Sequence, residues 1–202
     1  MDNVIKILKK VGAIMINDHF VYTSGRHGSV YINKDALYPH TTESSLIGQL
    51  FASKFKNKDI DVVVAPALGG IILSQWTAFH LSSFTGKEIL GLYTEKNAQN
   101  DQVFTRGYEK LVSGKNALVI EDITTTGGSL AKSIKSVQIA GGKVIATCTM
   151  INRDPNNVTS AKFGVPFSAL GVLKADSFDP VNCPLCKKNI RINYSVGHGK
   201  GL

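Results

Sequence analysis

Two adjacent carboxylates and the hydroxylated loop after them are the residues of this chain best suited to chemistry. Glu121 and Asp122 follow an apolar run at 117–120, and the next residues are Ile123, Thr124, Thr125, Thr126, Gly127, Gly128 and Ser129. Backbone N–H groups and hydroxyls of such a loop converge on an anion when the loop opens a helix. The loop therefore predicts a phosphate site, and the carboxylates beside it suit the hydroxyl groups of a sugar.

The elements around this loop place it at the edge of a sheet. Residues 117–120 form a short continuous apolar run, which is typical of a buried parallel strand, and we expect this strand to end at the two acids. Residues 129–140 have the apolar spacing of a helix. Ligands of open α/β sheets bind at the carboxyl ends of strands. Because neither Gly-Lys-Ser/Thr nor Gly-x-Gly-x-x-Gly occurs at the loop, the residues favour a phosphorylated ribose over a Walker-type or dinucleotide site.

The rest of the chain alternates strand and helix patterns. A second strand is predicted at 61–65, followed by Gly69 and Gly70 and by a helix that continues to about residue 84. This repeat of strand, glycine loop and helix predicts two anion sites along one sheet edge. The remaining patterns predict strands at 89–93, 143–151 and 167–173 and amphipathic helices at 4–11 and about 41–55. The predicted fold class is α/β, with a central parallel sheet flanked by helices.

The composition is that of an ordinary globular protein. The chain has 202 residues, of which 43% are hydrophobic and 19% charged, so we expect one domain. No apolar stretch is long enough to cross a membrane and the N-terminus lacks a signal-peptide pattern, so we expect a cytoplasmic protein without membrane attachment. The net charge of +8 fits a substrate with several phosphates. Nucleic acid is not expected as a partner, because the sequence has no arginine-rich run.

Two segments resemble a known enzyme family. The sequence Glu-Asp-Ile-Thr-Thr-Thr-Gly-Gly-Ser at 121–129 resembles the phosphoribosyl pyrophosphate motif of the type I phosphoribosyltransferases. The pattern Ser-Gly-Arg…Tyr-Ile-Asn-Lys-Asp at 24–35 resembles the N-terminal part of orotate phosphoribosyltransferases, where it helps to form a hood over the base. The resemblance runs over about residues 3–190. It implies a type I core in a single domain over 1–202, with a hood mainly from about 18–40 and the C-terminal tail as a further candidate for the hood.

The resemblance also implies a reaction. These enzymes transfer ribose 5-phosphate from phosphoribosyl pyrophosphate to orotate, giving orotidine 5′-monophosphate and pyrophosphate in pyrimidine (UMP) biosynthesis. They act as homodimers and use Mg2+, for which we expect no strong protein ligand here. Departure of pyrophosphate leaves positive charge on the sugar, as in glycoside cleavage. The protein is therefore expected to hold both ends of the sugar and to neutralise the leaving group, without a side-chain nucleophile.

The resemblance assigns these tasks to particular residues. Residues 124–128 would bind the 5-phosphate, and Glu121 and Asp122 the ribose hydroxyls. Ile123 and Ser129 would also contact phosphoribosyl pyrophosphate. Lys96 and Arg106, with the loop at Gly69 and Gly70, would receive the pyrophosphate. The implied catalytic residues are Lys96, Asp122 and Arg106, and the implied orotate-binding residues are Arg153, Thr125, Lys34 and Arg26. Arg153 suits the orotate carboxylate, because a guanidinium offers a bidentate fork that is always charged.

Some positions depart from the better-known bacterial orotate enzymes. Residues 94–108 are expected to form a mobile loop that closes over pyrophosphate, but the stretch 95–101 has only one lysine. Thr23 and Gly69 stand where those enzymes have lysines. The departures fit a separate branch of the family, and they also fit weakened catalysis. Two other functions remain open: a purine-base phosphoribosyltransferase, and a regulator that senses phosphoribosyl pyrophosphate and binds nucleic acid.

Three cysteines argue against a disulfide framework. Cys148 lies in a predicted strand and is expected to be a buried small hydrophobe. Cys183 and Cys186 form a Cys-Pro-Leu-Cys motif in the tail, which supplies half of a four-cysteine metal site, with His198 as the nearby extra ligand. Structural thiols, a structural metal site and a redox pair are the alternatives for this motif.

Overall fold

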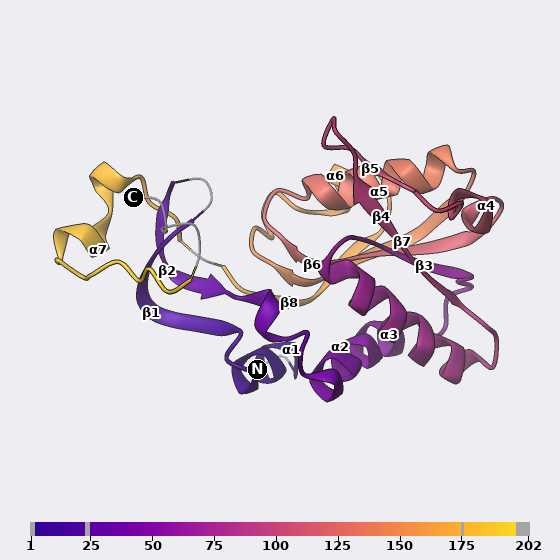
Figure 1. Ribbon diagram of the computed structural model, residues 1–202, viewed down its shortest axis with the longest axis horizontal. Helices are drawn as coiled ribbons and strands as arrows, with labels where there is room; N and C mark the ends of the chain where they lie inside the picture. Colours follow the sequence, from indigo (N-terminus) through magenta and orange to yellow (C-terminus); the bar gives the residue numbers. More distant parts are fainter. Residues whose placement is uncertain (1–2, 23–24, 175, 197–202) are drawn as a thin grey trace.

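The structure is a computed structural model that describes residues 3–22, 25–174 and 176–196. It has a large lobe and a small lobe (Figure 1). In chain order, the elements are α1 (Asn3–Lys10), β1 (Ile14–Val21), β2 (His27–Ile32), the 3-10 turn η1 (Lys34–Ala36), α2 (Thr41–Phe55), β3 (Val62–Pro66), α3 (Gly69–Thr85), β4 (Leu90–Lys96), β5 (Gln102–Val103), α4 (Glu109–Val112), β6 (Asn116–Thr124), α5 (Gly128–Ile139), β7 (Lys143–Asn152), α6 (Ser160–Phe163), β8 (Phe167–Val172), η2 (Pro180–Asn182) and α7 (Pro184–Lys187).

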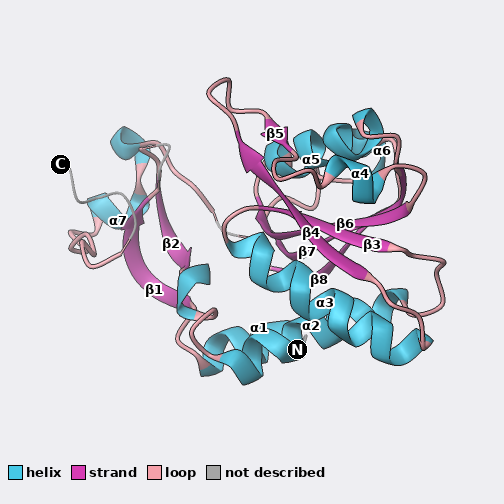
Figure 2. Cartoon of the chain, turned by 45° about the vertical axis from the view of Figure 1, so that its right-hand side comes forward, coloured by secondary structure: helices cyan, strands magenta, loops and turns pink. Residues whose placement is uncertain are grey.

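The large lobe is built on a six-stranded sheet in the order β5-β4-β3-β6-β7-β8. All neighbouring strands are parallel except β5, which runs antiparallel to β4. Helices lie on both sides of the sheet (Figure 2). This architecture confirms the predicted α/β class with a central, mostly parallel sheet. Among the described helices, none has the length and apolar character needed to cross a membrane.

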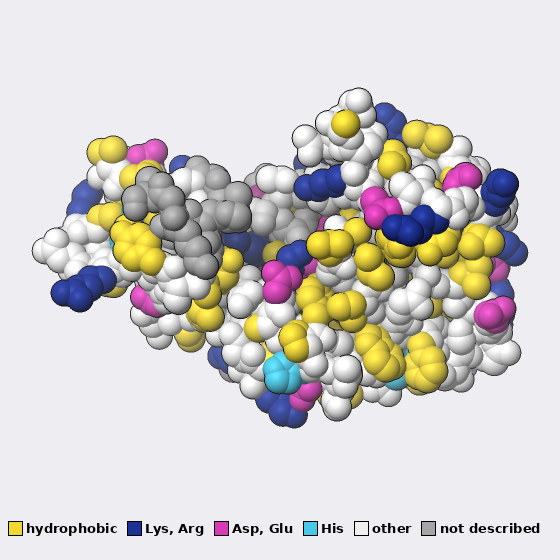
Figure 3. Space-filling model, viewed as in Figure 1, with side chains coloured by type: hydrophobic (Ala, Val, Ile, Leu, Met, Phe, Trp, Pro, Cys, Tyr) yellow, Lys and Arg dark blue, Asp and Glu magenta, His cyan; other side chains and the backbone are white. Residues whose placement is uncertain are grey.

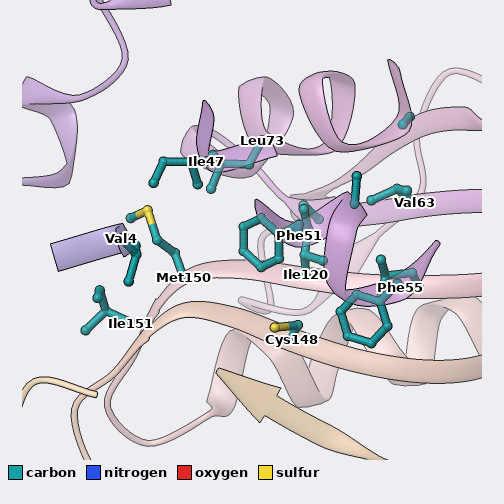
Figure 4. Close-up of a cluster of buried hydrophobic side chains, with 14 of the residues drawn as sticks. Val4, Ile47, Phe51, Phe55, Val63, Leu73, Ile120, Cys148, Met150 and Ile151 are labelled. Atoms are coloured by element: carbon teal, nitrogen blue, oxygen red, sulfur yellow. The ribbon is translucent and has the colours of Figure 1, made fainter. Parts of the chain in front are cut away.

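Two hydrophobic cores hold the helices against the sheet. Successive residues of β3 alternate between them, with Val63 in the core under α1, α2 and α3 and Val64 in the core under α5. Because both faces are covered, β3 is apolar along its whole length, as parallel strands usually are. In the first core, Phe51 and Phe55 of α2 lie with Ile120 and Cys148 of the sheet (Figure 4). Cys148 is fully buried, as predicted.

Two parts of the large lobe differ from the prediction. The strand expected to end at Glu121 continues to Thr124, because its ladder with β7 goes on through the pairs Glu121–Thr149 and Thr124–Asn152. The expected mobile loop at 94–108 contains regular structure. There β4 extends to Lys96 and turns back through β5, which pairs with it at Glu95 and Lys96. The sequence did not predict this short hairpin, because the stretch has few apolar residues. Its second strand, β5, is the outermost strand of the sheet.

The small lobe is formed by two segments that are far apart in the sequence, one near the N-terminus and one near the C-terminus. Strands β1 and β2 form an antiparallel hairpin, and residues 176–196 lie against it (Figure 1). His27 and Phe178 exchange backbone hydrogen bonds of 2.9 and 2.7 Å, and Asn193 N donates to His19 O at 2.7 Å. We call residues 14–32 and 176–196 the hood lobe. Thr23 and Ser24, which begin the predicted hood motif, and His198 lie outside the described residues.

Candidate active site

The two carboxylates lie at the carboxyl end of β6 and face the segment that follows the hood hairpin. Glu121 is 6% exposed and Asp122 is 4% exposed. Asp122 Oδ2 accepts hydrogen bonds from Lys34 Nζ at 2.7 Å and from the Tyr38 hydroxyl at 2.9 Å. The chain therefore ties the base of the hood to a core carboxylate, although 88 residues separate Lys34 from Asp122.

Burial and neighbouring charges shift the pKa values of Glu121, Lys34 and Tyr38. Burial, with the adjacent Asp122, raises the pKa of Glu121 well above its usual value. Burial alone would lower the pKa of Lys34, but its contact with Asp122 outweighs this and the net shift is upward. Burial and then Asp122 also raise the pKa of Tyr38. The site thus favours a protonated Glu121, a charged Lys34 and a neutral Tyr38 whose hydroxyl donates a hydrogen bond to Asp122.

The hydroxylated loop forms a small cup at the start of α5. The cup has a volume of 190 Å³ and is lined by residues 124–130 together with Glu121 and Ile123. Gly127, the residue before the helix, has a φ of 74°, and a Cβ there would lie 2.8 Å from the ring of Phe163. The first N–H groups of a helix have no partner within the helix and attract anions. The cup therefore has the geometry of the predicted phosphate site.

A cavity of 390 Å³ lies beside the cup, between the core and the base of the hood. Its lining includes Lys34, Lys96, Glu121, Asp122 and Ser129. The cavity thus contains two lysines and two carboxylates. The lysines can bind the negative charge of a sugar phosphate, and the carboxylates can bind its hydroxyl groups.

A third pocket, of 860 Å³, lies between the hood lobe and the end of β7. Its lining includes Tyr22, Arg26, Thr125 and Arg153. The Arg153 guanidinium carbon lies 4.8 Å from the centre of the Tyr22 ring, a cation–π arrangement. Arg153 Nε is buried and has no hydrogen-bond partner among the described residues. The pocket suits a flat ligand with negative charge.

The phosphate cup connects the other two pockets. It shares Glu121, Ile123 and Ser129 with the central cavity, and Thr125 and Thr126 with the third pocket. Three adjoining compartments can therefore hold a phosphate, a sugar with further charge, and a flat anion.

Most of the predicted site residues line these compartments; Arg106, Gly69 and Gly70 do not, and Lys34 lines a different compartment from the one expected. Arg106 is exposed and its Nε lies 3.7 Å from Glu95, and it does not line any of the three compartments. A Cβ on Gly70 would lie 2.7 Å from Cβ of Ala65, so Gly70 serves strand–helix packing. Lys34, predicted beside orotate, lines the central cavity with Asp122.

Gly69, by contrast, lies against the carboxylate site. A Cβ there would clash with the Tyr38 hydroxyl and lie 2.6 Å from Asp122 Oδ2. The absence of a side chain at this position lets Tyr38 reach Asp122.

Sequence reasoning missed several residues of the site. Tyr38 contacts Asp122 across 84 residues, and Tyr22 stacks on Arg153, which directly follows β7. Lys174 lines the third pocket from the segment after β8. No local pattern marks these residues, because each one depends on a contact between distant parts of the chain.

Comparison with known proteins agrees with this geometry. The sequence matches the phosphoribosyl transferase domain family over residues 33–193. The α/β sheet, the loop at the start of α5 and this match define the class as a type I phosphoribosyltransferase.

The individual relatives narrow the class. An orotate phosphoribosyltransferase from Caldanaerobacter subterraneus is 33% identical over 94% of this chain and 93% of that protein. Another from Thermotoga petrophila is 34% identical over 92% of each chain. The structure of orotate phosphoribosyltransferase from Aeropyrum pernix has a TM-score of 0.61 and 26% identity, and covers 83% of this chain and 92% of that one. This chain belongs to the orotate phosphoribosyltransferase family.

Proposed function

We propose that this protein transfers ribose 5-phosphate from phosphoribosyl pyrophosphate to a nitrogen of orotate, giving orotidine 5′-monophosphate and pyrophosphate. The observation that carries the proposal is Arg153, whose guanidinium stacks on Tyr22 beside the phosphate cup and has a buried, unpaired Nε within the described part of the chain. A planar guanidinium pairs with a carboxylate through two parallel hydrogen bonds. Orotate is a flat base that carries a carboxylate, so it suits both the arginine and the shape of the pocket.

Each compartment then has one task in the reaction. The cup at 124–129 holds the 5-phosphate, and Glu121 and Asp122 hold the ribose hydroxyls in the central cavity. Lys96 lines the same cavity at the end of β4, and its ammonium group stabilises the negative charge that develops on the departing pyrophosphate. Fixing the sugar between the cup and the orotate pocket supplies the alignment that a displacement at its anomeric carbon requires. No covalent intermediate with the protein is needed.

The Lys34 and Tyr38 contacts with Asp122 suit a site that must be held ready for the ribose. They fix the carboxylate at the edge of the cavity before the sugar arrives. Arg106 is assigned no contact with substrate in this arrangement. Reaching the pyrophosphate would require Arg106 to leave Glu95 and the β4–β5 hairpin to close.

Mg2+ is the proposed cofactor, and the oxygen-rich central cavity fits a hard cation. The strongest acceptors there are already engaged, because Asp122 binds Lys34 and Tyr38 and Glu121 favours its protonated form. Mg2+ would therefore be held mainly by oxygens of the substrate, next to these residues. When bound, it would offset the negative charge of pyrophosphate.

We further infer a single phosphoribosyltransferase domain that forms a homodimer. Hydrophobic side chains gather over α3 (Figure 3). On α3 and at the residue before it, the apolar side chains Leu68, Phe79 and Phe84 are 81%, 59% and 44% exposed. An apolar patch of this kind is typical of a protein interface. Light scattering coupled to gel filtration tests the inference, and a purely monomeric protein at micromolar concentration would contradict it.

The direct test of the activity follows orotate absorbance with purified protein, Mg2+ and phosphoribosyl pyrophosphate. The wild type should consume orotate, and Asp122→Asn should lose most of the rate because the ribose and Lys34 both lose a charged partner. Asp59→Asn is the matched control, because Asp59 is exposed, lies 3.3 Å from Lys87 before the start of β3, and lines none of the three compartments. Its rate should equal that of the wild type.

The same assay separates the alternatives. Turnover of adenine or xanthine in preference to orotate would identify a purine-base enzyme. Binding of phosphoribosyl pyrophosphate without turnover of any base, together with specific binding of nucleic acid, would identify a regulator. Either result would reject the proposed activity.

A further inference from the structure

The hood lobe contains a cluster of four metal-ligating side chains that the proposed reaction does not use. We propose that His19, His27, Cys183 and Cys186 form a structural Zn2+ site that fastens the C-terminal segment to the β1–β2 hairpin. One ligand atom from each of the four lies within 4.8 Å of the others. His19 is 1% exposed, His27 is 6% exposed and Cys183 is fully buried. Cys186, the fourth residue of the cluster, is partly buried.

The distances between these atoms suit a tetrahedral ion. Zn–N bonds of about 2.0 Å and Zn–S bonds of about 2.3 Å give tetrahedral edges of about 3.3–3.8 Å. His19 Nε2 lies 3.8 Å from both sulfur atoms, and His27 Nδ1 lies 3.3 Å from Cys186 Sγ. The two ring nitrogens, 2.8 Å apart, need to separate by about half an ångström to become ligands. Small rotations of the imidazole rings can provide this.

The surroundings hold the ligands in the orientation that a metal needs. His19 Nδ1 lies 2.7 Å from the carbonyl oxygen of Ile190 and donates to it, which leaves Nε2 free as a ligand. A carbonyl acceptor behind a ligating histidine is a typical feature of zinc sites. The backbones of His19 and His27 are each bonded to the C-terminal segment, at Asn193 and Phe178. The cluster is therefore supported from both sides by the chain.

The choice of metal follows from the ligands. Two thiolates and two imidazoles in a tetrahedral set favour Zn2+, and a hard cation such as Mg2+ prefers oxygen. Four protein ligands leave no open position, so the site is structural and takes no part in catalysis. A role in stability also fits the packing, because neither hydrophobic core includes a residue from the described segment 176–196. A small lobe without a core of its own commonly relies on a metal or on disulfides.

The site also bears on the base pocket. Arg26 precedes the ligand His27 and binds the carbonyl oxygen of Ser177 at 2.5 Å, and both residues line the pocket that contains Arg153. Loss of the metal should loosen this wall and leave the phosphate cup intact. This second step rests on the proposed function, whereas the presence of the metal does not.

Metal analysis of the full-length protein tests the proposal. Protein from zinc-supplemented cells should carry one zinc ion per chain, and X-ray absorption should give two Zn–S and two Zn–N bonds. Cys186→Ser and His27→Asn should lose the metal. Cys148→Ala is the matched control, because it removes a thiol that is buried in the large core. This variant should keep its zinc.

Wild-type protein stripped with a chelator avoids the risk that a variant simply fails to fold. Added Co2+ should give the stripped protein a near-ultraviolet thiolate-to-cobalt charge-transfer band and the visible ligand-field bands of a tetrahedral site, and Cys186→Ser should not show this spectrum. The KM for orotate should rise several-fold on stripping, with little change in the KM for phosphoribosyl pyrophosphate. Zinc-free wild type that takes up neither ion while its thiols are reduced would overturn the proposal. A Cys183–Cys186 disulfide in freshly purified protein, or zinc that remains in Cys186→Ser, would also overturn it.

Discussion

Replacing Glu121 by Gln should make the ligand-free protein more stable at neutral pH while removing most of its activity. The change keeps the shape of a side chain that is only 6% exposed and removes its charge. Burial and the neighbouring Asp122 raise the pKa of Glu121 well above 4.5. The folded protein therefore keeps a proton on Glu121 at pH values where the unfolded chain has released it.

The sign and size of the effect follow from this difference in protonation. At pH values between the pKa of Glu121 in the unfolded chain and its pKa in the folded protein, the folded state binds more protons. The free energy of unfolding therefore falls by about 1.4 kcal/mol for each unit by which the pH rises. The Gln variant lacks this slope. For a protein of this size, about 1 kcal/mol corresponds to about 2–4 °C in Tm. The Tm advantage of Glu121→Gln should then widen by about 3–6 °C per pH unit until the native carboxyl ionises.

Thermal unfolding followed by circular dichroism, from about pH 5 to about pH 8, measures this difference. Glu43→Gln is the control, because a hydrogen bond from Lys10 lowers the pKa of Glu43. The stabilising effect of Glu43 is complete above its unfolded pKa and is lost only on acidification. Its variant should show a Tm difference that does not change over the same range. A flat difference for Glu121→Gln, or one that narrows with rising pH, would refute the reasoning.

Three further changes test the compartments one at a time. Arg153→Lys should raise the KM for orotate about 10- to 100-fold, because it replaces a bidentate charged contact worth about 1.5–3 kcal/mol; an unchanged KM would remove Arg153 from the base site. Gly127→Ala should lower stability by about 1–2 kcal/mol in urea unfolding and weaken binding of phosphoribosyl pyrophosphate, because its φ of 74° and the nearby Phe163 ring disfavour a side chain; unaltered binding by calorimetry would contradict this. Lys96→Ala should lower kcat/KM for phosphoribosyl pyrophosphate about tenfold or more without changing Tm, because Lys96 is an exposed side chain facing the cavity; equal losses in rate and stability would argue for a structural role.

The parts of the site that lie in one continuous segment could be predicted from the sequence. The cup at 124–129 needs only a strand, a glycine turn and a helix, and each of these has a local pattern. The two acids were placed correctly at the sheet edge, although the strand that carries them is longer than predicted. Its extension depends on pairing with β7, and polar residues such as Glu121 and Asp122 conceal that pairing in the sequence.

The parts that depend on distant contacts could not be predicted. The sequence marked Lys34 as a charged residue in the hood motif, but its position on Asp122 follows from how the hood packs on the core. The tail motif left a metal site, with His198 as the extra ligand, as one of three alternatives beside structural thiols and a redox pair. The histidines that face Cys186 in the structure are His19 and His27, and the latter is 159 residues away. A sequence motif reveals a zinc site when its ligands lie a few residues apart. These two histidines lie on different strands, β1 and β2, so no motif marks them.

The same long separation has a consequence for how the protein folds. His19 is made early in synthesis, whereas Cys183, 164 residues later, is made after every strand of the large sheet. Contacts between such distant residues form late, because closing the intervening chain has an entropic cost that earlier folding of the core reduces. The core with its phosphate cup should therefore assemble first, and the wall of the base pocket that the tail supports should be completed last. A chain released from synthesis before its tail has docked would be able to recognise the sugar phosphate before it can select a base.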